Sequence, residues 1–128
     1  MADSFNLSGD FRNSIINIKS TLTNVQQSIG QMHTGDLSTR KELEELIGKL
    51  NEALQKTPES HREQAEALAE TTKALVEVAK AEKPNKTMLQ ITSAGLKQAA
   101  QNLAGVMPLV VPIAAQIVMT VARLAGAG

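Results

Sequence analysis

The stretch that decides the fold runs from Phe11 to Ile29 and reads FRNSIINIKSTLTNVQQSI. Its apolar residues recur at alternating intervals of four and three, as far as Met32. They are Phe11, Ile15, Ile18, Leu22, Val25, Ile29 and Met32. This heptad spacing aligns side chains along one stripe of an α-helix, and no strand pattern fits so long a run. It predicts a helix from about Asp10, a suitable N-cap residue, to about Gly30.

The residues before this helix have a different pattern. Apolar and polar residues alternate over 5–11, which predicts a short extended segment. After the helix, Gly30 and Gly35 indicate a loop over 31–37. We expect residues 5–32 to form one N-terminal part of the domain.

Residues 39–82 are rich in Glu and Lys and predict a charged helical hairpin. Thr39 and Glu42 have the spacing of a capping box, which would open a helix with a stripe at Leu43, Leu46, Ile47, Leu50 and Leu54. Pro58 ends that helix, and 60–63 form a second candidate box. The next stripe consists of Ala65, Leu68, Ala69, Thr72, Leu75, Val76 and Ala79. The short connection predicts that the two helices are antiparallel.

Residues 87–125 predict apolar C-terminal helices broken at Pro108 and Pro112. No charge occurs over 98–122, and 103–122 have about the length that crosses a bilayer core of about 30 Å. The candidate residues for burial in a core or a membrane are Leu103, Val106, Leu109, Val110, Ile113, Ile117, Val118 and Val121. A helix that is apolar on all sides is either buried or in lipid, so both interpretations stay open.

The composition excludes several classes of function. The formal net charge is zero, with 13 basic and 13 acidic residues, and the only aromatic residues are two Phe. Nucleic acid is therefore not an expected partner. Because the chain has no Cys, disulfides and thiolate chemistry are excluded, which fits a cytoplasmic location. No secretory signal is apparent at the N-terminus, and association with the inner face of the membrane is the alternative.

No pattern of catalytic or ligand-binding residues stands out. His33 and His61 lack the spacing of a metal site, and the Glu residues of the hairpin alternate with Lys and Arg as on a solvated helix face. We find no nucleophile elbow and no phosphate-binding loop. The sequence predicts a protein that is not an enzyme, with no cofactor, no metal and no small-molecule substrate.

Two stretches resemble a group of small bacterial proteins. Residues 6–25, NLSGDFRNSIINIKSTLTNV, and residues 82–91, EKPNKTMLQI, resemble parts of small helical proteins and modules of cyanobacteria and related bacteria. Some of these accompany signalling or conflict-system domains, as effector-associated modules do. The resemblance implies an adaptor or a membrane-acting effector.

The expected fold is a single all-α domain, a bundle of four or five helices with a central antiparallel hairpin. The first functional hypothesis is a self-associating module whose apolar C-terminal part is buried in an assembly or inserted in a membrane, as in a pore-forming effector. The oligomer would use Phe11, Ile15, Ile18, Leu22, Val25 and Ile29. The alternative is a soluble adaptor that recruits a signalling or defence protein through the uncharged face of the helix predicted over about 10–30.

Overall fold

The computed structural model describes residues 2–32, 35–81 and 83–125 and consists there of helices and their connections. The helices are α1 (Ala2–Gly30), α2 (Leu37–Leu54), α3 (Arg62–Ala79), α4 (Lys86–Leu103) and α5 (Val110–Leu124), with a short 3₁₀ turn, η1 (Glu59–His61), before α3. The prediction of an all-helical bundle with four or five helices is confirmed.

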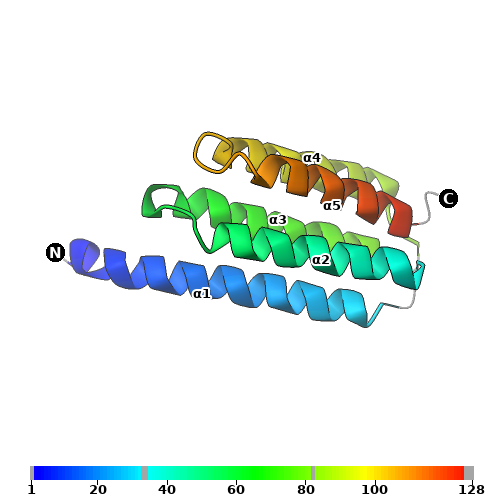
Figure 1. Cartoon of the computed structure of the whole chain (residues 1–128), viewed down its shortest axis with the longest axis horizontal. Helices are drawn as coiled ribbons and strands as arrows, with labels where there is room; N and C mark the ends of the chain where they lie inside the picture. The colour runs from blue at the N-terminus through cyan, green and yellow to red at the C-terminus, as the bar shows by residue number, and fades with distance from the viewer. Residues whose placement is uncertain (1, 33–34, 82, 126–128) are drawn as a thin grey trace.

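The helices lie roughly parallel or antiparallel to one another in three layers (Figure 1). The antiparallel helices α2 and α3 form the middle layer, α1 lies on one side of them, and α4 and α5 lie on the other. Helix α2 packs most closely on α1 and α5, whereas α3 packs on α1 and α4. The central hairpin is therefore held by the outer layers more than by direct contact between its own two helices.

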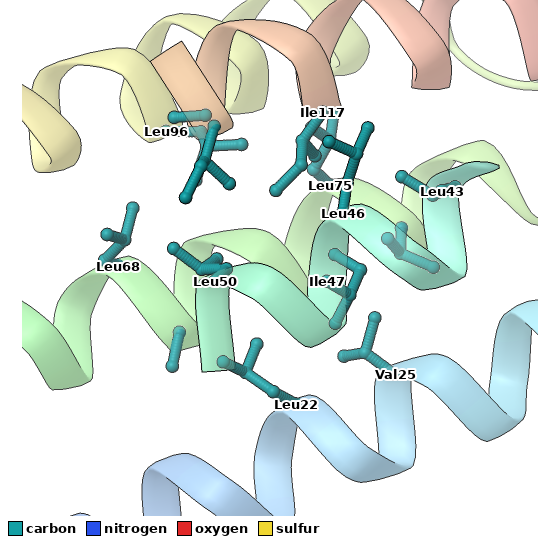
Figure 2. Packing of buried hydrophobic residues seen from close by; sticks show 14 of the residues in the cluster. Leu22, Val25, Leu43, Leu46, Ile47, Leu50, Leu68, Leu75, Leu96 and Ile117 are labelled. Atoms are coloured by element: carbon teal, nitrogen blue, oxygen red, sulfur yellow. The ribbon is translucent and has the colours of Figure 1, made fainter. Parts of the chain in front are cut away.

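The core is apolar and draws on all five helices. Figure 2 shows Leu22 and Val25 of α1 close to Ile47 and Leu50 of α2, with Ile117 of α5 on the far side of the hairpin. The stripes that the spacing predicts for α2 and α3 are the residues that the fold buries. The three-and-four periodicity therefore located the packed faces of these helices correctly.

The N-terminal prediction was wrong in one respect. Helix α1 begins at Ala2, so residues 5–11 are helical and not extended, and Asp10 is not the N-cap. An isolated extended segment would have no neighbouring strand to pair its backbone groups in an all-helical protein. A helix pairs those groups within itself, and no proline interrupts residues 2–30.

The start of α2 also differs from the prediction. Asp36 is the N-cap, and its Oδ2 accepts hydrogen bonds from the backbone N of Thr39 at 3.1 Å and from the Thr39 hydroxyl at 2.6 Å. Thr39 therefore donates hydrogen bonds to the N-cap residue and is not the N-cap itself. The Glu42 carboxylate accepts a hydrogen bond from Arg123 and not from the backbone N–H of Thr39. The second candidate box also fails, because the His61 N-cap of α3 makes no side-chain bond and η1 occupies 59–61.

The uncharged C-terminal stretch is divided between two helices. Helix α4 ends at Leu103 and α5 begins at Val110, with a connection over 104–109 that contains Gly105 and Pro108. Pro112 lies within the first turn of α5, where its missing N–H leaves no helical hydrogen bond unmade. In the part of the chain that the structure describes, no helix is both long and apolar enough to cross a membrane.

Candidate protein-binding groove

The side chains considered for chemistry do not come together. Among the described residues no group of three or more His, Cys, Asp or Glu side chains is placed to hold a metal ion. The His61 ring is hydrogen-bonded to Ser60, with 2.8 Å between the Ser60 Oγ and the His61 Nδ1. His33 lies outside the described residues.

The predicted oligomerisation stripe of α1 faces the protein's own interior. Ile18, Leu22, Val25 and Ile29 are buried, and Ile15 is partly buried against the same core. The side chain of Phe11 lies outside the described part of the chain. From Ile18 to Ile29 the stripe is covered by α2 and α3, so another copy could contact it only if this packing opened.

The predicted C-terminal residues divide into three groups. Leu103, Val110, Ile113, Ile117 and Val121 belong to the core, and Val118 packs partly against it. Val106 and Leu109 are exposed, in the connection between α4 and α5. Most of this apolar sequence is thus buried within its own chain.

A surface cavity with a volume of about 780 Å³ lies between α4 and α5. Its α4 side consists of Lys86, Leu89, Gln90, Ser93, Ala94 and Lys97. Its α5 side consists of Val118, Val121, Ala122 and Ala125. We call this cavity the α4–α5 groove. Its lining residues come from the first part of α4 and the last part of α5. The start of α4 and the end of α5 lie at the same end of the bundle (Figure 1).

Short side chains explain why this groove is open. Ser93 and Ala94 on α4 face Ala122 and Ala125 from α5, and none of them is long enough to fill the space between the helices. Leu89 and Val118 pack partly against the core and form an apolar floor. A concave, mostly apolar surface with a few polar groups is the usual form of a binding site.

The only charged side chains that line the groove are Lys86 and Lys97. Both are exposed, and no ion pair with an acidic side chain is found for either of them in the described residues. No Asp or Glu occurs in the sequence after Glu82. Lys86 is also the first residue of α4, where the helix dipole is positive. The edge of the groove is therefore cationic.

Two other cavities are weaker candidates. One of about 350 Å³ between α2 and α5 is lined by charges of both signs, including Lys49, Glu52 and Lys56. One of about 40 Å³ between α1 and α3 has room for about one water molecule. The α4–α5 groove is larger than either and has charge of one sign only.

No pattern in the sequence predicted this groove, although Val118 and Val121 are among the candidate residues for burial. The signal that could have found it is the combination of small residues on both helices with an absence of acidic residues from 83 onward. That signal has meaning only once α4 and α5 are known to lie side by side.

Comparison with known proteins adds nothing to this description. No model of a protein family, no curated protein and no solved structure matches the chain. The groove is accordingly assigned from its own geometry and charge.

Proposed function

We propose that this protein is a non-enzymatic helical module that binds a partner protein, and that it does so by accepting an amphipathic helix in the α4–α5 groove. The observation that carries the proposal is the groove itself, a surface cavity of about 780 Å³ with an apolar floor. Binding of a helix in an apolar groove between two helices is a recurrent mode of recognition. The class of function is that of the predicted adaptor, but the proposed binding surface is the α4–α5 groove and not the uncharged face of α1.

The outer face of α5 supports the same function. Met119 is 66% exposed and lies one helical turn before Ala122, which lines the groove. Ala115 and Ala122 flank it on the same face, so the surface beside the groove is apolar as well. Methionine side chains adapt to the shape of a partner, which is why they are frequent at binding surfaces.

The test is a selection from a displayed library of helical peptides on the immobilised protein. Ala122→Phe fills the groove from an exposed position and should leave the core intact. Ala74→Phe makes the same change at an exposed position of α3, away from the groove, and is the matched control. We expect peptides to be enriched on the parent and on Ala74→Phe, and not on Ala122→Phe. Equal enrichment on all three proteins would place the binding site elsewhere.

A second proposal, self-association, is supported by the length of α1. This helix has 29 residues, whereas α2 and α3 have 18 each. Its N-terminal turns extend beyond the turn between α2 and α3 (Figure 1). Ile16, at the middle of this helix, is 59% exposed. Light scattering should then give a mass above the 13.7 kDa of one chain, and Ile16→Glu should lower it. If the unmodified protein has the mass of a single chain even at high concentration, self-association is excluded.

A further inference from the structure

The two lysines of the α4–α5 groove lie on one edge of it. Lys86 and Lys97 are eleven residues apart on α4, which corresponds to about three helical turns and about 16 Å along the axis. A separation of three whole turns places both side chains on the same side of the helix. The groove therefore has a positive charge near each end of one wall, with Leu89, Ser93 and Ala94 between them.

Among the residues that the structure describes, no carboxylate is paired with either of these lysines. Residues 83–128 contain four cations and no Asp or Glu. Arg123 is engaged by Glu42 of α2. The lysines of α2 and α3 differ in this respect, because they alternate with Glu along the same helices. The α4 edge thus presents two lysines with no acidic partner among the described residues, and a carboxylate from outside the chain would pair with them.

The helix dipole increases this positive potential. Lys86 is in the first turn of α4, where a cation is unfavourable and an acidic residue would stabilise the helix. A local choice that opposes the stability of the helix indicates a functional site more often than an ordinary surface. An external carboxylate near Lys86 would interact favourably with both the ammonium group and the helix N-terminus.

We infer that the occupant of the α4–α5 groove is an amphipathic helix of a partner protein with acidic residues near both ends. The helix is about three turns long, and its apolar stripe packs against Leu89, Val118 and Val121. Two acidic residues about eleven positions apart pair with Lys86 and Lys97. This inference rests on the proposed function and specifies its partner. A concave cavity suits a helix better than a flat lipid surface. Two lysines without an aromatic residue do not form a site for nucleic acid.

The experiment uses three helix-stabilised peptides of about fifteen residues with the same apolar stripe. They differ only at the two flanking positions, which hold Glu and Glu, Gln and Gln, or Lys and Lys. Fluorescence anisotropy gives the dissociation constant of each peptide with the full chain at low and high salt. Exposed ion pairs are weak, so we expect the Glu peptide to bind about 2- to 30-fold more tightly than the Gln peptide, and the Lys peptide least tightly. High salt should reduce the difference.

Variants of the protein assign the effect to the two lysines. Lys86→Gln with Lys97→Gln should make the Glu and Gln peptides bind equally. The matched control is Lys41→Gln with Lys73→Gln, at exposed positions of α2 and α3 outside the groove, and it should retain most of the preference. Circular dichroism of both double variants checks that they are folded. Equal loss of preference in the two double variants would mean that the total charge of the protein, and not the groove, attracts the acidic peptide.

The remaining outcomes separate this inference from the proposed function. If Glu and Gln peptides bind the parent equally and Ala122→Phe abolishes both, the acidic partner is wrong and the groove stands as a helix-binding site. If no peptide binds, the proposed function fails as well. Sedimentation with phosphatidylserine vesicles that the Glu peptide inhibits would assign the groove to a lipid surface. Self-association that the Glu peptide disrupts would assign it to a second copy of this chain. Either result would overturn the inference.

Discussion

Arg123 of α5 donates a hydrogen bond to the carboxylate of Glu42 on α2, with 2.5 Å between the Arg123 Nη2 and the Glu42 Oε2. The same oxygen accepts a hydrogen bond at 3.1 Å from the hydroxyl of Thr120, which is buried and also bonds to the carbonyl of Gln116. This contact joins helices whose bonded residues are 81 positions apart in the sequence. Arg123 is the one arginine of α4 and α5, and this contact engages it. The cations beside the groove are therefore the lysines of α4.

The first prediction concerns this ion pair. The side chains of Arg123 and Glu42 are 56% and 48% exposed, so solvent screens their attraction. A double-mutant cycle with Glu42→Gln and Arg123→Gln should give a coupling free energy of about 0.2–1 kcal/mol. Urea unfolding in low and high salt measures it, and the coupling should fall as salt increases. A coupling of several kcal/mol would mean that the pair is desolvated.

The second prediction compares two neighbouring isoleucines of α1. Ile18 is 1% exposed in the core, whereas Ile16 is 59% exposed. Ile18→Ala should lower the free energy of unfolding by about 2–5 kcal/mol, because it removes buried methyl groups and leaves a cavity. Ile16→Ala should change it by less than about 0.5 kcal/mol. Similar losses in both variants, measured by urea unfolding, would show that α1 does not pack on α2 and α3 through the heptad stripe.

The third prediction concerns Gly35, which precedes the N-cap of α2. Its φ is +79°, and a Cβ at this position would collide with the side chain of Leu124 at the end of α5. Gly35→Ala should therefore destabilise the protein by at least about 1 kcal/mol, from the left-handed backbone alone. Gly105→Ala is the control, because a Cβ there meets nothing within 4 Å. If the two variants have the same melting temperature, the approach of Gly35 to Leu124 is not present in solution.

The fourth prediction concerns the pH dependence of the α2 N-cap. The hydrogen bond from the Thr39 hydroxyl, and then that from the Thr39 N–H, hold the pKa of Asp36 below its ordinary value of 3.8. A lowered pKa in the folded state means that the cap stabilises the protein above about pH 3.8 and that this contribution is lost as the pH falls through the lower, folded value. Asp36→Ala should melt at a lower temperature than the parent at neutral pH, and the difference should shrink on acidification.

Asp36→Asn is the control for that experiment. The amide oxygen can accept the same hydrogen bonds but does not titrate in this range. The difference in melting temperature between Asn and Ala variants should therefore stay constant while that between parent and Ala falls. Parallel behaviour of all three proteins on acidification would show that Asp36 does not titrate as a cap.

The sequence by itself determined the helices and their buried faces. The three-and-four spacing of residues such as Ile18, Leu22, Leu43 and Leu50 is a property of neighbours within one helix, and burial follows from it because one stripe of each helix is apolar. Pro58 and Pro108 marked two of the interruptions for the same local reason. The absence of charge between Lys97 and Arg123 also indicated that the C-terminal part would be covered. Most of its large apolar side chains are covered by this chain's own helices.

Only the tertiary structure decided which of several local possibilities occurred. Residues 5–11 suit either a strand or a helix, and the helix forms because the bundle offers no strand for pairing. Thr39 and Asp36 could each cap α2, and the left-handed turn at Gly35 brings Asp36 into that position. The groove has no signature in either helix alone. It exists because α4 and α5 pack side by side with Ala94 and Ala122 facing the same space, a relation between residues that are distant in the sequence and therefore invisible to any local pattern.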